Sequence, residues 1–299
     1  MPNFEQSSPQ NYVDKEHPTE VQTQESEFLV KFWGVRGLVP SPGTNTSRYG
    51  GNTACVEMQV AKKRLIFDGG TGLRLLGRSL LQQQQSIEAH LFFTNSQSNR
   101  IQGFPFFAPA FLTENSFHIY GTAALNGASI KQCLYDQMLQ PHFPYPLQVM
   151  QSKLHFYNFA PGKVFKVDDI TITTALINRH QKSVGYRVAW KDYSVAYITD
   201  LHPSPNEADK EHIVQITKGI DLLIANATYT PPSIRKHDQT QTYWETAVDL
   251  AQNIGAKWLI ISHHHPDDCD DFLDGVQTQV KSIFPKALLA REGLILLVD

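Results

Sequence analysis

The chain has 299 residues, of which 41% are hydrophobic and 18% charged, enough for one large domain or two small ones. Its 26 basic and 29 acidic residues give a net charge of −3, which argues against a general attraction to nucleic acid or to an anionic membrane. No apolar run reaches the roughly 18 residues of a transmembrane helix, and the first residues lack the segments of a secretory signal. The three cysteines, Cys55, Cys133 and Cys269, are far apart, which favours reduced thiols and a cytoplasmic location.

The chain divides into a polar leader and one domain. Residues 1–27 are rich in Gln, Glu, Ser and Pro, which predicts a disordered tail. Short apolar or alternating runs then predict strands. In chain order, these strands cover residues 29–33, 54–60, 64–67, 90–94, 116–120, 154–157, 170–176, 184–189, 194–198, 221–225 and 258–261. Helices are expected over residues 71–84, 128–139, 207–218, 242–254 and 270–282. Strands and helices that alternate without a linker predict a single α/β domain over residues 28–299.

Several short segments follow one another in the order that is typical of a known family. They read GVRG (34–37), RYGGNT (48–53), FDGGTGLR (67–74), GFPFF (103–107), GYR (185–187), YITD (197–200) and SHHHP (262–266). Together they resemble the metallo-β-lactamase superfamily, and more narrowly its cyclic-nucleotide-phosphodiesterase-like and ribonuclease-Z-like branch. The resemblance implies an αββα sandwich of two mixed β-sheets flanked by helices. It also implies a site at one edge, between the sheets.

The loop after the strand expected at 90–94 departs from the pattern of that branch. The branch carries His-x-His-x-Asp-His there, which supplies ligands to a two-metal site. The resemblance places this chain's Asn95, Gln97, Asn99 and Arg100 at those four ligand positions and Arg179 at the next one, although a shift of one residue would bring in His180. The bridging aspartate is retained as Asp200 and the last histidine as His263, whereas Gln241 stands where the branch often has a further histidine.

These replacements change what the site can bind. Amide side chains are weaker metal ligands than imidazole or carboxylate, and arginine keeps its proton and cannot bind a metal. Asp200 and His263 alone do not hold a catalytic zinc ion, so the degenerate motif predicts no metal, no other cofactor and no catalytic residue.

The two arginines suggest two hypotheses about charge. A buried Asp200 without metal ions would be costly, and Arg100 or Arg179 is expected to pair with it. Alternatively, the two guanidinium groups bind an anionic ligand such as a nucleotide. Asp68 is expected to support the site loop through hydrogen bonds, and His264 and His265 to support the neighbouring loop.

Two functions remain open at this point. The first is a catalytically inactive member of the superfamily that acts as a binding, regulatory or assembly component, with a protein or an anionic small molecule as its partner, and that forms a homodimer as relatives often do. The alternative is an active phosphodiesterase or related hydrolase with an altered or single-metal site for zinc or manganese. That alternative requires His180, Asp200 and His263 to converge with His202, His264 or His265.

Overall fold

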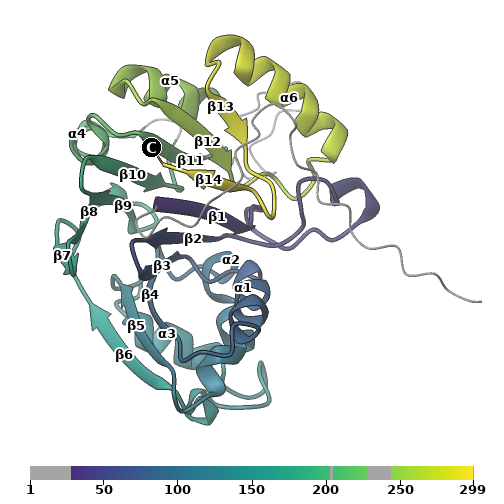
Figure 1. Cartoon of the computed structure of the whole chain (residues 1–299), viewed down its shortest axis with the longest axis vertical. Coiled ribbons are helices and arrows are strands. Elements are labelled where there is room, and N and C mark those ends of the chain that lie inside the picture. Colours follow the sequence, from purple (N-terminus) through teal and green to yellow (C-terminus); the bar gives the residue numbers. More distant parts are fainter. Residues whose placement is uncertain (1–27, 203–204, 228–243, 299) are drawn as a thin grey trace, which may run out of the picture.

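Two mixed β-sheets, packed face to face and covered by helices on their outer sides, form the described part of the chain (Figure 1). The structure, a computed structural model, describes residues 28–202, 205–227 and 244–298. This architecture is the αββα sandwich expected from the sequence. The tail expected at residues 1–27, and Gln241, lie outside the described residues.

The first sheet has the strand order β14-β1-β2-β3-β4-β5-β6. Strands β3 to β6 run parallel to one another, whereas β14, β1, β2 and β3 pair antiparallel. In β1 alternate residues are buried, because one face of the strand lies on the core between the sheets. The strands are β1 (Phe28–Gly34), β2 (Cys55–Val60), β3 (Lys63–Phe67), β4 (Glu88–Phe92), β5 (Ser116–Gly121), β6 (Lys153–Asn158) and β14 (Ile295–Leu297).

The second sheet has the order β13-β12-β11-β10-β9-β8-β7. Strands β10 to β13 are parallel, and β7 to β10 are antiparallel. The parallel strands β11 and β12 are almost continuously apolar, as expected for strands covered on both faces. The strands are β7 (Val164–Val167), β8 (Ile170–Asn178), β9 (Ser183–Trp190), β10 (Tyr193–Ile198), β11 (Leu222–Asn226), β12 (Trp258–Ser262) and β13 (Ala287–Leu289).

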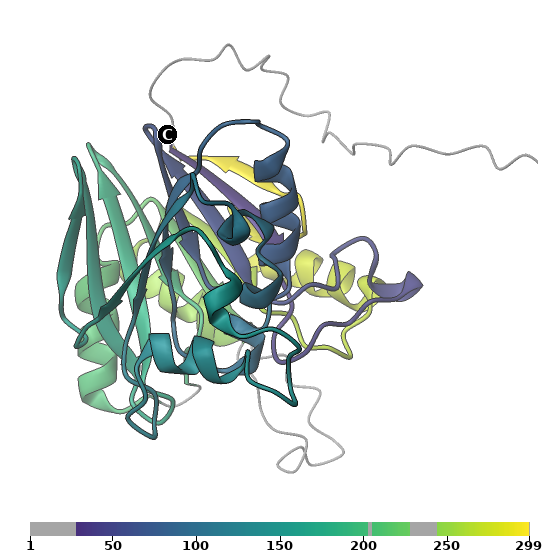
Figure 2. The same cartoon turned by 90° about the horizontal axis from the view of Figure 1, so that it is seen from below.

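Helices cover the outer face of each sheet. Helices α1 and α3 pack on the first sheet, and α4, α5 and α6 pack on the second. Figure 2 shows, after a 90° turn, the teal and green strands of the second sheet on the side away from α1. The helices are α1 (Gly72–Leu81), α2 (Ser98–Ile101), α3 (Ile130–Asp136), α4 (Glu207–Thr217), α5 (Glu245–Ile254) and α6 (Asp270–Ile283). Short 3-10 turns cover Thr44–Thr46, Phe104–Phe106, Ala108–Phe111 and Leu147–Val149. None of the helices within the described ranges is long and apolar enough to cross a membrane.

Three hydrophobic clusters hold these layers together. The cluster between the sheets contains stacked and edge-on aromatic rings, among them Phe67, Phe92 and Tyr186. A second cluster lies under α4, α5 and α6, and a third lies under α1 and α3. The inner cluster fixes the distance between the two sheets and therefore sets how the loops at their edge meet.

Candidate functional site

Loops that follow strands of both sheets meet at one edge of the sandwich. Asp68 follows β3, and Asn95 lies in the loop after β4, whereas Asp200 follows β10 and His263 follows β12. The loop after β4 contacts the second sheet directly, since Val184 N–H donates to the Thr94 carbonyl at 2.9 Å. The Asn95 amide donates to Ser183 Oγ at 2.9 Å. This edge, the strand-end site, brings together most of the residues selected from the sequence.

A buried ion pair lies at the centre of the strand-end site. Asp68 accepts hydrogen bonds from the Thr94 N–H at 2.8 Å, the Thr94 hydroxyl at 3.0 Å and the Tyr197 hydroxyl at 2.9 Å. The Arg100 guanidinium forms an ion pair with the same carboxylate, and both side chains are almost fully buried. The Arg100 guanidinium also donates to Thr199 Oγ1 at 2.8 Å and to the Thr199 carbonyl at 2.5 Å. Arg100 therefore joins β3 of the first sheet to the end of β10 in the second.

The charges of this pair shift the pKa values around it. Burial alone would lower the pKa of Arg100, but the charges of Asp68, Tyr197 and Asp200 and the hydrogen bond to Asp68 together outweigh that effect, and the pKa is raised. Burial and the Asp68 charge raise the pKa of Tyr197 well above its ordinary value, so the phenol stays a donor to Asp68. The supporting hydrogen bonds expected of Asp68 are thus present, to Thr94 N–H and Thr94 Oγ1.

Helix α2 positions Arg100 through close backbone contacts. Gly69 N–H donates to the Arg100 carbonyl at 2.6 Å, and Gly103 N–H donates to the Gly69 carbonyl at 2.9 Å. A Cβ atom at Gly103 would lie 1.9 Å from the Gly70 carbonyl oxygen. Only glycine permits this approach. A helix of one turn is not stable by itself, so contacts with the loop after β3 stabilise α2.

The prediction that Arg100 or Arg179 forms an ion pair with Asp200 is wrong. Asp200 accepts hydrogen bonds from Ser183 Oγ and, at 3.4 Å, from the Asn95 amide. The ion pair of Arg100 is with Asp68. The physical reason is that α2 is bonded to the loop after β3 and so directs Arg100 toward Asp68, while the charge of Asp200 acts on Arg100 only as a weaker, more distant influence.

Arg179 lies at the turn between β8 and β9 and is directed to helix α4. Its Nε and Nη2 atoms donate to Asp209 Oδ1 at 3.2 and 3.1 Å. Burial would raise the pKa of Asp209, but the hydrogen bonds and charge of Arg179 lower it. Both arginines therefore neutralise carboxylates of the protein itself. Arg100 is also too buried to meet a ligand from solvent. These contacts weigh against the anion site that the sequence predicted at Arg100 and Arg179.

The three consecutive histidines point to different surroundings. His263 is buried at a φ of 60°, and neither ring nitrogen has a hydrogen-bond partner among the described residues. Burial, followed by the charge of Arg100, lowers its pKa well below the ordinary value. The Nε2 atom of His264 lies 2.8 Å from the Ala290 carbonyl, and burial lowers its pKa to about 4. His265 Nδ1 lies 3.5 Å from Asp267 at the surface.

The residues required by the hydrolase alternative do not form a compact ligand set. The rings of His180 and His202 are tilted by 40° to each other, with their centroids 5.7 Å apart. Within the described ranges, however, His180, Asp200 and His263 do not belong to any group of three His, Cys, Asp or Glu ligand atoms that all lie within 4.8 Å of one another.

A cavity of about 330 Å³ opens beside the strand-end site. Its walls come from the loop after β4, the loop after β5, helix α3 and the β8–β9 turn, and they carry amide, hydroxyl and ammonium groups among apolar atoms. The lining residues are Asn95, Ser96, Gln97, Thr122, Ala123, Ala124, Leu125, Asn126, Cys133, Gln181 and Lys182. Sequence reasoning missed Gln181, Lys182 and Ser183, although they lie just before the Gly185-Tyr186-Arg187 motif, with Val184 between, and this motif was the signal available.

Comparison with known proteins agrees with this architecture. Ribonuclease Z of Trichodesmium erythraeum (strain IMS101) is 23% identical over 318 residues, which cover 89% of this chain and 94% of the relative. The metallo-beta-lactamase fold protein YhfI from Bacillus subtilis has a TM-score of 0.63 at 17% identity, over 91% of this chain and 99% of that one. A diphosphatase of the PhnP family also has a TM-score of 0.63, at 15% identity, over 90% and 97% of the two chains. At these identities the solved structures establish the fold alone.

A family model described as "Beta-lactamase superfamily domain" matches residues 63–264. This stretch covers more than half of the chain and runs from β3 to the histidines after β12. The chain therefore belongs to the beta-lactamase superfamily.

Proposed function

We propose that this chain is a non-hydrolytic member of the superfamily that binds a small polar molecule beside its strand-end site. The observation that carries the proposal is the buried guanidinium of Arg100, bonded to Asp68 and Thr199. The resemblance places a metal-binding histidine at this position. Here a fixed positive side chain joins the two sheets instead, and the neighbouring carboxylate is already neutralised.

The donor set at the strand ends does not fit a two-metal centre. Two hydrolytic zinc ions need about five or six imidazole and carboxylate ligands. Of the positions that the resemblance assigns to ligands, Asp200 and His263 carry such groups, and Asp200 is bonded to Ser183 and Asn95. The positive charge of Arg100 also acts on His263 and disfavours a cation there. We therefore derive no chemistry through a metal at this site.

The adjacent cavity supports a binding role. A volume of about 330 Å³ lies at the lower end of the range for small-molecule sites, roughly 300–1,000 Å³. The amides of Gln97 and Gln181, which are bonded to each other, offer further donors and acceptors, and Lys182 offers a cation. A small molecule with hydrogen-bonding groups and one negative charge, such as a cyclic nucleotide, matches this lining. Lys182 takes the anion-binding role that the sequence assigned to Arg100 and Arg179.

The absence of hydrolysis is tested by restoring the ligands. The wild-type chain, purified and saturated with zinc or manganese, is expected to leave bis(4-nitrophenyl) phosphate intact. A variant with Asn95→His, Gln97→His, Asn99→Asp, Arg100→His and Arg179→His should bind metal that is lost again on adding Asp200→Asn. Wild-type hydrolysis that requires a metal and disappears in Asp200→Asn would contradict the proposal and favour the hydrolase alternative.

Ligand binding is tested by calorimetry with nucleotides, cyclic nucleotides and short RNA. We expect binding of at least one of these probes, and Lys182→Gln should weaken it about tenfold, the effect of losing one charged hydrogen bond. Lys191→Gln is the matched control, because Lys191 follows the opposite end of β9 and lies over the Trp190 ring. No heat with any probe, or equal loss in both variants, would contradict binding in this cavity.

A further inference from the structure

A row of histidines crosses the parallel strands of the first sheet, at the third residue of β4, β5 and β6. The in-register pairing of β4, β5 and β6 aligns His90 with His118 and His118 with His155. Their rings stack at centroid distances of 4.7 and 4.9 Å. One row further along the strands, Phe92, Tyr120 and Tyr157 stack in the same way at 4.5 and 4.7 Å. Side chains of alternate residues share a face, so these two rows lie side by side.

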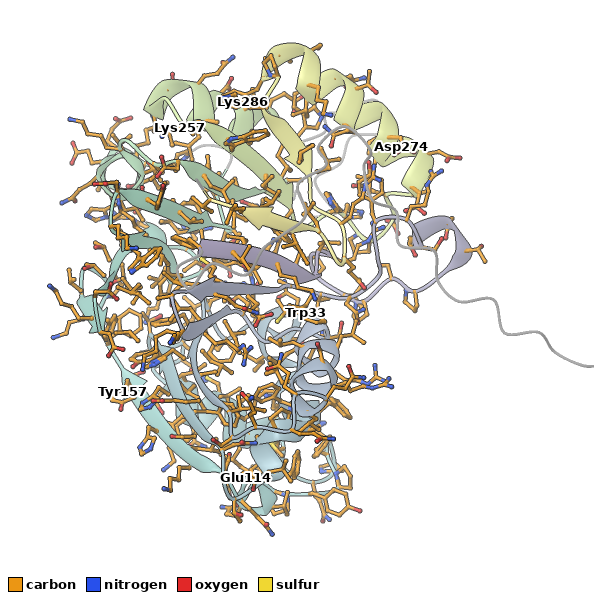
Figure 3. All side chains as sticks on the ribbon, viewed as in Figure 1. Trp33, Glu114, Tyr157, Lys257, Asp274 and Lys286 are labelled. Carbon is orange, nitrogen blue, oxygen red and sulfur yellow. The ribbon has the colours of Figure 1, made fainter. Side chains whose placement is uncertain are left out.

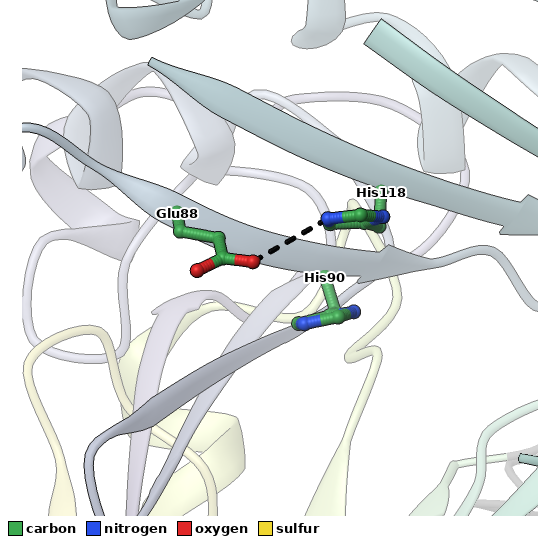
Figure 4. Close-up of side chains that lie close together, drawn as sticks. All are labelled: Glu88, His90 and His118. Carbon is green, nitrogen blue, oxygen red and sulfur yellow. Dashed lines mark ion pairs between the residues drawn. The ribbon is translucent and has the colours of Figure 1, made fainter. Parts of the chain in front are cut away.

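Glu88 completes a cluster of ligand atoms with two of these histidines. One atom from each of Glu88, His90 and His118 lies within 4.8 Å of the others (Figure 4). The Glu88 Oε1 atom lies 3.5 Å from His118 Nε2. Zinc bonds of about 2.0–2.2 Å place neighbouring ligand atoms roughly 3.4 Å apart, so this pair already has the required separation. The His90 and His118 rings stack at an interplanar angle of 14°, and an imidazole binds a metal in the plane of its ring, so a shared ion requires the His90 ring to rotate out of the stack.

The tyrosine row orients the two imidazoles. His90 Nδ1 lies 3.3 Å from the Tyr120 hydroxyl, and His118 Nδ1 lies 3.1 Å from the Tyr157 hydroxyl. When each Nδ1–H donates to a phenol oxygen, the Nε2 atom keeps its lone pair for a metal. Burial raises the pKa of Tyr120 to about 12, so its phenol remains available as a partner. A polar group bonded to the second ring nitrogen is the usual support of a metal-binding histidine.

The two imidazoles are also prepared for a cation by their surroundings. Burial, and then the neighbouring His118, lowers the pKa of His90 to about 4, and burial and His155 lower the pKa of His118. Both rings are therefore neutral at neutral pH, the form that binds metals. His90 is buried, whereas Glu88 is mostly exposed. The open side leaves coordination positions for water.

Access to this face depends on the edge of the second sheet. Phe165 of β7 packs edge-on against Tyr120 and so covers that part of the row. Tyr157, beyond it, is 40% exposed and lies on β6 at the outer edge of the molecule (Figure 3). The side chains of His118 and Glu88 are themselves 21% and 56% exposed, so an ion can reach them from solvent.

We propose that Glu88, His90 and His118 form a binding site for one divalent transition-metal ion, with zinc as the expected ion. Two imidazoles and one carboxylate suit zinc and its neighbours rather than magnesium or calcium. The site is separate from the strand-end site, because it lies near the amino-terminal ends of β4 and β5 and the strand-end residues lie beyond the carboxyl-terminal ends.

Zinc titration of the chelator-stripped full chain by calorimetry tests the site. We expect one zinc ion per chain, with binding lost in Glu88→Gln and His118→Gln. Tyr157→Phe should weaken binding about tenfold, the effect of removing a group that orients a ligand. Because the Glu88 side chain is mostly exposed, Glu88→Gln should keep the thermal unfolding midpoint of the zinc-free wild type, so that a loss of binding reports on the ligand.

Two control variants define the site. His155→Gln, in the same row but outside the cluster, and Asp200→Asn, at the strand-end site, should keep the wild-type affinity. Tetrahedral cobalt absorption in the wild type, absent in Glu88→Gln, would give a second readout. An absence of zinc binding overturns the proposal. So does zinc binding that persists in Glu88→Gln or disappears in Asp200→Asn.

Discussion

The two ends of the parallel strands of the first sheet carry polar groups in opposite conditions. At the carboxyl ends, Asp68 and Arg100 neutralise each other in a buried network that joins both sheets. Near the amino ends, His90 and His118 are neutral imidazoles beside a partly exposed carboxylate. The first region has its charge balanced within the protein, and the second has two neutral imidazoles close to a carboxylate that is partly exposed.

If the zinc site that we propose is present, a ligand site in this chain cannot be inferred from fold position alone. In the superfamily that the sequence resembles, metal chemistry belongs at the carboxyl ends of the strands, yet here the compact group of imidazole and carboxylate ligands in the described ranges lies near the other end. Residue chemistry and saturation of hydrogen bonds decide which end can accept a cation.

The largest expected effect comes from breaking the internal ion pair. Arg100→Met leaves Asp68 charged and buried, with Thr94 and Tyr197 as its remaining donors. Removing one partner of a buried pair costs about 3–5 kcal/mol, so urea unfolding should show a loss of that size. The double variant Asp68→Asn/Arg100→Met should lose less than the sum of the single variants. A loss below about 1 kcal/mol for Arg100→Met would place the pair among weak surface pairs.

Gly103→Ala should disturb the same region through the backbone. The added Cβ would collide with the Gly70 carbonyl, so α2 must move, and overpacking of this kind costs about 1–3 kcal/mol. Gly275→Ala is the matched control in α6, because its Cβ would meet no atom within 4 Å. This control should gain about 0.5–1 kcal/mol in urea unfolding from its higher helix propensity. Equal changes in the free energy of unfolding of the two variants would argue against a close backbone contact between α2 and the loop after β3.

The buried, neutral His264 also predicts that the free energy of unfolding depends on pH. Its pKa is about 4 in the folded chain and about 6.5 when unfolded, so the unfolded state takes up the proton first as the pH falls. The contribution of neutral His264 is complete above about pH 6.5 and declines down to about pH 4. Between pH 7.5 and 5, the wild type should lose about 2 kcal/mol more than His264→Gln in urea unfolding. An identical pH response in both chains would contradict a buried, neutral His264.

The smallest expected effect concerns the open region. Zinc at ten times its dissociation constant should stabilise the chain by about 1.4 kcal/mol, because it binds the folded state. Thermal unfolding with and without a chelator should show this gain in the wild type and in Asp200→Asn, but not in Glu88→Gln. If Asp200→Asn loses the gain in stability, zinc binds at the strand-end site and not at Glu88, His90 and His118.

The sequence predicts the elements that carry strong periodic or apolar patterns. The strands of the inner core and the helices α1, α4 and α6 were predicted within a few residues of their bounds. Strands β7, β13 and β14 were not predicted. Each has only three or four residues and forms through hydrogen bonds to the neighbouring strand of its sheet, which no local sequence pattern reports. Helix α2 was not predicted either, because its single turn depends on backbone bonds to the loop after β3.

The site was predicted less completely than the fold. The sequence drew attention to Asp68, Arg100 and Asp200, and the structure brings Asp68 and Arg100 into contact. The partner of Arg100 was wrong because 32 positions of chain separate it from Asp68, and no local pattern reports such a contact. The row of His90, His118 and His155 was missed for the same reason, since it exists only through strand register.

The left-handed backbone at Asp68, with φ near 60°, restricts which residues a mutational library can recover there. Gly, Asn and Asp adopt this conformation most readily. Among these three, only Asp offers an anionic carboxylate to Arg100, Thr94 and Tyr197. Selection for folded chains should therefore return almost exclusively Asp at position 68, whereas the exposed Gln97 should tolerate many replacements. The number of residue types accepted at a position would thus show where the backbone conformation and the charge of the side chain are both required.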